Sequence, residues 1–168
     1  MIDITVLSEK YDVIRMDESY VDAIYDICKG NPQFYLFSEA QLNKEQILQD
    51  LKLTPPGIAL KDKYFLGFYR EDVLVAVMDV VDGYPEKGIC FIGFFMMNQE
   101  FQGKHAGTAI IKGVLDSLQK MGYHAVRLCI DKGNPQSTHF WMKNGFMVIK
   151  EVDRNQHTVL LAEKSLNI

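Results

Sequence analysis

The segment 94–110, FFMMNQEFQGKHAGTAI, contains the residues of this chain whose types and spacing most directly suggest chemistry. It runs from an apolar stretch through a glycine-containing turn into a helical pattern. The first amides of a helix have no partners inside the helix, and the helix dipole places partial positive charge there. Backbone N–H groups from Gly103 to Thr108 can therefore bind the oxygens of a phosphate group, with a charge added by Lys104. The segment predicts an anion site, although a plain tight turn before a helix has the same pattern.

Motifs for other nucleotide and metal sites do not occur in the sequence. GxGxxG is typical of dinucleotide-binding folds and GxxxxGK[ST] of P-loops, and both are absent. Cys28, Cys90 and Cys129 are widely spaced without a CxxC pair, and the four histidines have no metal-binding spacing. We therefore expect three reduced, mostly buried thiols and no metal site.

A second block of residues follows, and the two blocks together carry a family resemblance. Asn134-Pro135-Gln136-Ser137 is followed by Phe140-Trp141 and by Lys143-Asn144-Gly145-Phe146. The first block contains Gln102-Gly103-Lys104-His105-Ala106-Gly107. These ordered blocks resemble the GNAT family of N-acetyltransferases, whose phosphate loop reads Arg/Gln-x-x-Gly-x-Gly/Ala at the start of a helix. The resemblance extends from a first strand near Ile4 to a last strand near Leu161.

This resemblance implies a fold, an acyl donor and a set of cofactor-binding residues. The implied fold has three layers, α/β/α, around a splayed central mixed sheet, and the implied donor is acetyl-coenzyme A or a related acyl-coenzyme A. The pyrophosphate would lie on the loop and first helical turn, and the pantetheine arm beside the end of the preceding strand. The implied cofactor-binding residues are Met96, Met97, Asn98, Gln102, Gly103, Lys104, His105, Ala106, Gly107, Thr108, Asn134 and Phe140.

Two positions depart from the family pattern. His105 stands where the family loop usually has glycine. Because a β-carbon disfavours positive φ, we expect either ordinary helical backbone at His105 or a slightly remodelled loop, with the ring either in solvent or against a coenzyme A phosphate. Trp141 stands where many members have the tyrosine that protonates the leaving thiolate. An indole N–H is no practical acid, so we expect Trp141 to pack against cofactor or substrate, and another group or water to supply the proton.

Direct attack on a thioester requires a neutral amine, and this requirement points to a base. An alkylamine with a pKa of about 10.4 is only about one part in 10³ neutral near pH 7. Deprotonation therefore adds about 4 to 5 kcal/mol to the activation barrier. A carboxylate, acting directly or through water, can remove the proton. The apolar strand before the phosphate loop has no Asp or Glu, so the nearest candidates are Asp79 and Asp82 on the neighbouring strand and Tyr84 beyond it. We select Asp79 and Tyr84 as candidate catalytic residues, although both also fit structural roles.

Periodicity predicts the elements that position these residues. Helical spacing predicts helices over residues 20–29, 38–51 with Ser38 as N-cap, 106–121 and 135–143. Apolar runs predict strands over residues 64–69, 73–81, 89–97, 126–130, 146–151 and 158–163. An antiparallel meander followed by a strand–helix–strand crossover gives a fold of the α+β class with one mixed sheet.

Composition limits the partners. Eighteen Lys and Arg against 22 Asp and Glu give a net charge of −4, which offers no basic excess for nucleic acid. The longest apolar runs fall far short of the roughly 20 residues that a membrane helix needs. We expect a single acetyltransferase domain over residues 1–168, located in the cytoplasm. The apolar final hairpin leaves a homodimer open.

The expected reaction is acetyl transfer to a primary amine of a small molecule, because the chain shows no module for docking a protein partner. Two alternatives stay open: an acetyltransferase acting on a protein N-terminus or lysine, and a non-catalytic acyl-coenzyme A sensor. We expect the acceptor pocket between the two N-terminal helices and the loop over residues 82–88, with aromatic walls from Phe34, Tyr35, Phe37 and Tyr84.

Overall fold

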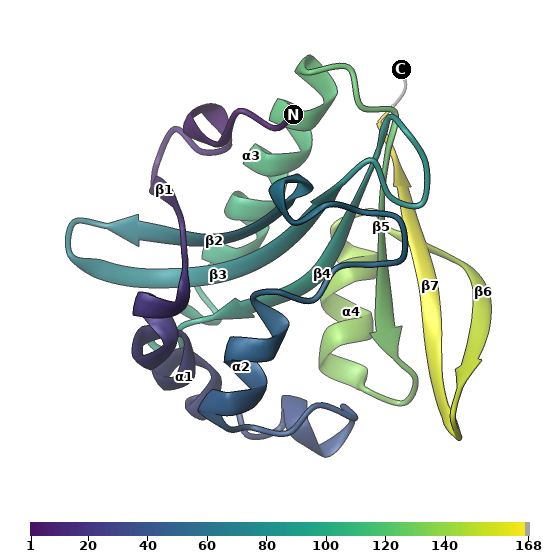
Figure 1. Ribbon diagram of the computed structural model, residues 1–168, viewed down its shortest axis with the longest axis horizontal. Helices are drawn as coiled ribbons and strands as arrows, with labels where there is room; N and C mark the ends of the chain where they lie inside the picture. Colours follow the sequence, from purple (N-terminus) through teal and green to yellow (C-terminus); the bar gives the residue numbers. More distant parts are fainter. Residues whose placement is uncertain (167–168) are drawn as a thin grey trace.

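A seven-stranded mixed sheet in the order β1-β2-β3-β4-β5-β7-β6 organises the chain (Figure 1). The computed structural model describes residues 1–166. The strands are β1 (Asp12–Arg15), β2 (Lys63–Arg70), β3 (Val73–Asp82), β4 (Ile89–Met97), β5 (Ala125–Asp131), β6 (Met147–Arg154) and β7 (His157–Ser165). The helices are α1 (Val21–Lys29), α2 (Lys44–Asp50), α3 (Ala106–Lys120) and α4 (Pro135–Lys143). One-turn 3-10 helices occur at Ile4–Val6, Glu18–Tyr20, Phe34–Leu36, Leu60–Asp62 and Gln99–Phe101.

Strand pairing confirms the predicted mixed sheet. β1 to β4 form an antiparallel meander, β4 and β5 are parallel, and β7 pairs antiparallel with both β5 and β6. β4 and β5 are in register only from Ile89 opposite Ala125 to Ile92 opposite Leu128. Beyond Ile92, β4 continues to Met97 and β5 to Asp131 without pairing with each other, and Figure 1 shows the two strands diverging. This divergence is the splay that the family resemblance implied.

Helices cover both faces of the sheet and create two cores, which confirms the three-layer arrangement. On one face, Ile24 and Ile27 of α1 and Ile47 of α2 pack against Phe65 and Val77 of the meander. The core on the other face contains the apolar side of α3 and the end of α4, packed on β2 to β5. Its buried members include Ile110, Ile111, Val114, Leu118, Leu66, Phe68, Met78, Val126, Leu128, Trp141 and Phe146. The sheet is therefore buried around the point where β4 and β5 separate.

The predicted beginning of the fold is wrong in its first element. Residues near Ile4 form a 3-10 helix rather than a strand, and the first strand is β1. The Asp3 side chain accepts a hydrogen bond from the Thr5 amide (3.0 Å), and such a local turn competes with strand pairing. The strand prediction relies on the β-branched residues Ile4, Thr5 and Val6 and does not take this local hydrogen bond into account.

The second predicted helix is also shorter than expected. It begins after Asn43, whose side-chain oxygen accepts the Gln46 amide at 2.7 Å. Ser38 is not the N-cap: its hydroxyl oxygen accepts the Ala40 amide (3.1 Å) in a preceding turn. Both residue types favour N-caps, so composition alone does not choose between them. The predicted helices over α1, α3 and α4 agree with the structure to within a residue, and the closing hairpin is longer than predicted.

Candidate active site

One continuous cavity of about 1300 Å³ follows the gap where β4 and β5 separate. We call its two parts the cofactor half and the acceptor half. The cofactor half is walled by the loop before α3, the first turn of α3, and α4. The acceptor half is walled by α1, α2, the loop between them, and residues of β2 and β3. A ligand in one half can therefore meet a ligand in the other at the splay.

The loop before α3 contains two residues with left-handed backbone. Gly103 has φ +71°, and His105, the N-cap residue of α3, has φ 60°, which is the left-handed region. Ordinary helical backbone at His105 is thus wrong, because the residue keeps the positive φ that glycine adopts easily. The Ala109 amide donates to the His105 carbonyl at 3.0 Å. The amides of the preceding turn therefore lie before the first bond within the helix and are available to an anion.

A polar network holds this loop against the end of β4. The side-chain amide of Gln102 donates to the Asn31 side-chain oxygen and to the Met97 carbonyl (3.3 Å). The Asn31 amide donates to the carbonyls of Ile27 and Met97, both at 2.9 Å. Gln102 is thus a bridge between the loop, β4 and the end of α1, and Asn31 is a site-forming residue that the sequence analysis missed.

Gly107 lies in close contact with the wall of the cofactor half. A β-carbon at Gly107 would lie 3.2 Å from Phe140 Cε2 and 3.5 Å from the Met97 side chain. Phe140 itself stacks on Phe95, with ring centroids 5.7 Å apart and planes 17° apart. The glycine therefore allows the first turn of α3 to approach the aromatic wall formed by α4, while its amide stays at the cavity.

Asn134 begins α4 beside the cavity. Its Oδ1 accepts the Ser137 amide at 3.1 Å, which caps the helix, and the residue is 5% exposed. Among the described residues its Nδ2 group has no hydrogen-bond partner. Asn134 lines the cavity, so this free donor is compatible with the pantetheine contact that the resemblance implied.

Trp141 belongs to the core and also lines the cavity. It is 7% exposed and makes edge-to-face contacts with Phe140 and Phe146 at centroid distances of 5.0 and 5.1 Å. Its ring also meets Phe95 at 5.9 Å. The indole stabilises the aromatic wall of the cofactor half, and it offers no ionisable proton.

The edge of β4 opens at a bulge. Asp79 is opposite Phe94 and Val80 is opposite Ile92, so Gly93 is the extra residue on β4. Gly93 also begins the part of β4 that lacks β5 as a partner. Backbone groups that point toward β5 from this stretch lack strand partners, and buried backbone groups require them. They are suited to bind the amide groups or thioester carbonyl of a ligand.

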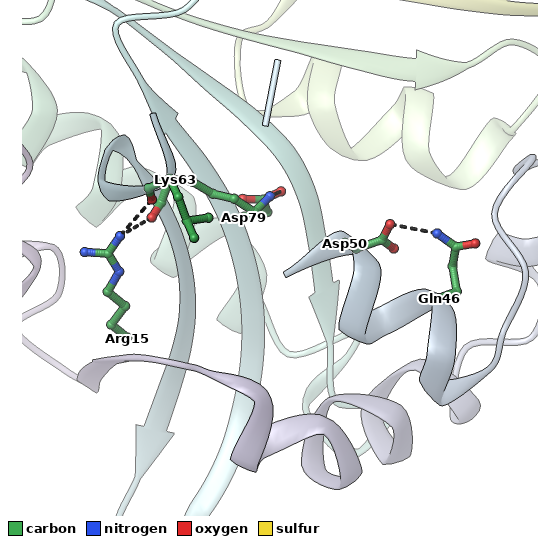
Figure 2. Close-up of polar contacts among 6 residues, drawn as sticks. Arg15, Gln46, Asp50, Lys63 and Asp79 are labelled. Atoms are coloured by element: carbon green, nitrogen blue, oxygen red, sulfur yellow. Dashed lines mark hydrogen bonds and ion pairs between the residues drawn. The ribbon is translucent and has the colours of Figure 1, made fainter. Parts of the chain in front are cut away.

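Asp79 is placed beside this bulge in the acceptor half (Figure 2). Its Oδ2 accepts a hydrogen bond from Lys63 Nζ at 2.6 Å, and the two side chains are only 13% and 4% exposed. Its Oδ1 is buried and has no hydrogen-bond partner among the described residues. Burial raises the pKa of Asp79 above its ordinary value, and the Lys63 charge opposes that rise. A carboxylate with a raised pKa is a stronger base near neutral pH.

The remaining polar candidates have different surroundings. Tyr84 lies in the wall of the acceptor half and packs edge-on against Phe91, with centroids 5.4 Å apart. Asp82 instead accepts the Tyr123 hydroxyl at 2.7 Å and pairs with the N-terminal amine at 2.9 Å. Asp82 is therefore a structural carboxylate, and of the two candidates on β3 it is Asp79 that lines the cavity.

The structure brings most of the expected cofactor-binding residues to the cavity. Asn98 and Lys104 are exceptions. The side-chain amide of Asn98 donates to the Leu74 carbonyl at 3.0 Å, and Lys104 Nζ donates to the Glu100 carbonyl at 2.9 Å. Phe37 likewise lies outside the lining of the acceptor half. The residues that do line the cavity are Met96, Met97, Gln102, Gly103, His105, Ala106, Gly107, Thr108, Asn134 and Phe140, with Phe34 and Tyr35 on the acceptor side.

The acceptor half carries acidic charge. Asp50 lies at the end of α2, where its Oδ1 accepts a hydrogen bond from the side-chain amide of Gln46 at 2.9 Å. Glu39 lies in the loop before α2 and also lines the cavity. Figure 2 shows Asp50 on α2 across from Asp79. The negative charge of Asp50 adds to the rise in the pKa of Asp79. With Lys63 as the counter-charge in this half, the surroundings favour a cationic ligand.

The three cysteines are free thiols and are poorly suited to nucleophilic catalysis. Burial raises the pKa of Cys28, Cys90 and Cys129 above the ordinary thiol value. Because the thiolate is the reactive form, these side chains are mostly protonated near neutral pH. Among residues 1–166, no group of three His, Cys, Asp or Glu side chains is placed to hold a metal ion. None of the helices in that part of the chain is long and apolar enough to cross a membrane.

Comparison with known proteins assigns this arrangement to the acetyl-coenzyme A-dependent acetyltransferases. The family model described as "Acetyltransferase (GNAT) family" matches residues 20–146, and the chain belongs to this family. A search of curated proteins found no match.

Solved structures share the fold at low sequence identity. An acetyltransferase from Thermus thermophilus is 16% identical with a TM-score of 0.74, covering 95% of this chain and 98% of that one. The PaiA N-acetyltransferase from Thermoplasma acidophilum, solved with coenzyme A, is 16% identical with a TM-score of 0.66, covering 92% and 98%. A spermidine N-acetyltransferase chimera from Vibrio cholerae and hSSAT is 14% identical with a TM-score of 0.70, covering 94% and 96%.

The residues of the cofactor half fit acetyl-coenzyme A. The first-turn amides of α3 offer donors to a pyrophosphate, and the open edge of β4 and the Asn134 Nδ2 group offer partners to the amides of pantetheine. When bound, acetyl-coenzyme A supplies the acetyl group as a thioester. Within the fold, the chain's own contribution is to orient that thioester toward the acceptor half.

Proposed function

We propose that this acetyltransferase, acting as one domain over residues 1–168, transfers the acetyl group to a primary amine of a small molecule. The observation that carries the proposal is the buried carboxylate of Asp79 in the acceptor half, beside the bulge where β4 and β5 separate. Asp79 and the residues of the loop before α3 line the same cavity, which supports a proton acceptor close to the donor site.

The walls of the acceptor half support a small cationic acceptor. Phe34, Tyr35 and Tyr84 provide aromatic surface, and Asp50 and Glu39 provide negative charge. The loop between α1 and α2 adds residues to the same wall, so three segments of the chain line the acceptor half. Aromatic faces also attract ammonium groups. The combination suits an amine on an apolar body.

In the proposed reaction, acceptor and donor are present together. The amine nitrogen forms a bond to the acetyl carbon, the bond from that carbon to sulfur breaks, and the proton from the nitrogen passes to Asp79 directly or through one water. The departing thiolate takes a proton from solvent. Tyr84 is the second proposed catalytic residue, since its hydroxyl-bearing ring lies in the same wall.

A panel of acceptors tests the proposal. We expect thiol release and acetylated product, detected by mass spectrometry, with alkylamines, diamines and spermidine. Peptides with a free N-terminus and peptides with an internal lysine form the comparison. Turnover only with peptides would replace the small-molecule acceptor by a protein one. Binding of acetyl-coenzyme A without turnover on any acceptor would favour a sensor.

We also propose a homodimer formed through the edge strand β6. Met147, Val148 and Ile149 on this strand are 72%, 40% and 49% exposed, and an exposed apolar edge is suited to pair with a second copy. Light scattering should give twice the monomer mass, and Ile149→Lys should reduce it; a monomer at all concentrations would contradict the proposal. The three free thiols support a reducing compartment such as the cytoplasm.

A further inference from the structure

Lys63 is an unusually buried lysine at the first position of β2. Its side chain is 4% exposed, and lysine is rarely buried to this extent without a partner. The partner is Asp79 Oδ2 on the adjacent strand, at 2.6 Å. Since desolvation of two charges costs free energy that their attraction only partly offsets, a buried pair is weak evidence of a purely stabilising role.

The pair leaves the two oxygens of Asp79 in different states. Oδ2 is occupied by Lys63, and Oδ1 is buried without a partner among the described residues. A buried carboxylate oxygen without a donor loses hydrogen-bonding free energy unless a ligand or water supplies one. The unpaired Oδ1 is therefore in the state expected of an atom that receives an N–H from a bound amine or water.

Gly93 provides the space in which the carboxylate lies. A β-carbon at Gly93 would be 3.0 Å from Asp79 Oδ2 and 3.5 Å from its Cγ. Any larger residue at the bulge would meet the side chain of Asp79. The carboxylate thus lies directly over the backbone of β4 where this strand separates from β5.

Arg15 fixes the backbone from which Lys63 extends. Its guanidinium donates to the Lys63 carbonyl and to the Lys61 carbonyl (3.1 Å), as Figure 2 shows for the contact with Lys63. The guanidinium also lies 4.5 Å from the centre of the Tyr64 ring. The start of β2 is therefore held by β1, on the side away from the cavity.

We propose that Lys63 is a positioning residue for acetyl transfer: its ammonium holds Asp79 by Oδ2 and keeps it ionised, so that Oδ1 accepts the proton of the acceptor amine. The proposal rests on the proposed function, in which Asp79 is the base. The charged groups that face Asp79 are Lys63 from β2 and Asp50 from α2, while the facing residue of β4 is the uncharged Gly93. Without Lys63, burial and Asp50 both oppose ionisation of Asp79.

The test is the pH dependence of kcat/KM with one alkylamine as acceptor. The acid limb of this profile is the pH range in which kcat/KM falls as the pH is lowered. Because the ammonium pKa of the acceptor is the same for every variant, a difference in the position of the acid limb reports a group of the protein. Lys63→Met should move the acid limb to higher pH. For each pH unit of this shift, kcat/KM at a given pH on the acid limb should fall about tenfold. The deficit should shrink as the pH rises. Lys63→Arg keeps a cation and should have an acid limb close to that of the wild type.

A second comparison uses Asp79→Asn as the background. If Lys63 acts through Asp79, adding Lys63→Met to Asp79→Asn should not lower kcat/KM further. An equal loss at every pH in Lys63→Met, or a further loss in the double variant, would overturn the proposal. The double variant removes both charges of the pair, so it provides the comparison even if Lys63→Met alone does not fold.

The outcomes also separate this proposal from the proposed function. A wild-type protein without turnover on any amine would contradict the small-molecule acetyltransferase itself. Wild-type activity in Asp79→Asn would contradict Asp79 as the base. Loss of activity in Asp79→Asn together with an unshifted acid limb in Lys63→Met would contradict only the role of Lys63.

Discussion

Substitution of Gly107 tests whether the first turn of α3 binds the pyrophosphate of acetyl-coenzyme A. A β-carbon there would lie 3.2 Å from Phe140 Cε2, which is tight but borders on a side chain that can shift slightly. Alanine should therefore be tolerated with a small loss. Valine adds two methyl groups, and overpacking of this kind costs about 1–3 kcal/mol. We expect Gly107→Val to displace Phe140 and separate the helix from the aromatic wall.

The effect on binding follows from the donors that would be lost. Loss of two charge-assisted hydrogen bonds, at about 1.5 kcal/mol each, raises the Kd for acetyl-coenzyme A on the order of 100-fold. Ligand at 100 times the wild-type Kd stabilises the native state by about 2.7 kcal/mol, or roughly 5–10 °C in Tm for a chain of this size. In Gly107→Val the same concentration should stabilise by only about 0.4 kcal/mol, or roughly 1–2 °C.

Thermal unfolding with and without acetyl-coenzyme A measures both quantities. Gly113 provides the control, since it lies in the same helix, its β-carbon would be 3.1 Å from the Leu7 carbonyl oxygen, and it does not line the cavity. Gly113→Ala should lower the Tm of the free protein yet keep the full ligand-induced shift. A full shift in Gly107→Val, or an equal loss in Gly113→Ala, would refute the placement of the pyrophosphate.

Three further predictions concern other groups of the cavity. His105→Gly removes a side chain from left-handed backbone, so the Tm should rise slightly. The Kd for acetyl-coenzyme A, measured by calorimetry, should be unchanged. A tenfold rise in Kd would instead indicate that the His105 ring contacts a phosphate. Asp50→Asn should raise the KM of a diamine about tenfold in steady-state assays, whereas Glu45→Gln on the same helix but outside the cavity should not; equal effects would count against an acidic acceptor half. Cys28 and Cys90, whose pKa values burial raises, should resist alkylation near neutral pH until the protein unfolds; an acetyl-cysteine formed with acetyl-coenzyme A alone would indicate a covalent route.

The element order could be predicted because its signals are local. α3 has a clear apolar stripe and α4 begins with the capping residue Asn134 before a proline, and the structure follows both signals closely. The strand prediction near Ile4 is wrong because a hydrogen bond from the Thr5 amide to Asp3 outweighs β propensity over three residues. The N-cap prediction at Ser38 is wrong because Asn43, which also favours N-caps, accepts the Gln46 backbone amide instead.

The cofactor half was predictable for a different reason from the acceptor half. The proposed phosphate loop is a continuous segment whose backbone offers the hydrogen-bond donors, so the sequence from Gly103 to Thr108 describes it almost completely. The Asp79–Lys63 pair joins residues 16 positions apart, and it depends on strand register and on the bulge at Gly93. Lys63 lies just before the predicted strand over residues 64–69, where a lysine indicates exposure. A buried partner for Asp79 could therefore not be read from the chain alone.

The most direct test of the account compares two acceptors on wild type and Asp79→Asn at neutral pH. One is an alkylamine, which must lose a proton before attack, and the other is an aniline, which is already neutral. Asp79→Asn should bind acetyl-coenzyme A like the wild type, lose about 10²- to 10⁴-fold in kcat/KM with the alkylamine, and lose much less with the aniline. An equal loss with both acceptors, or no loss with the alkylamine, would contradict the claim that Asp79 accepts the proton of the attacking amine.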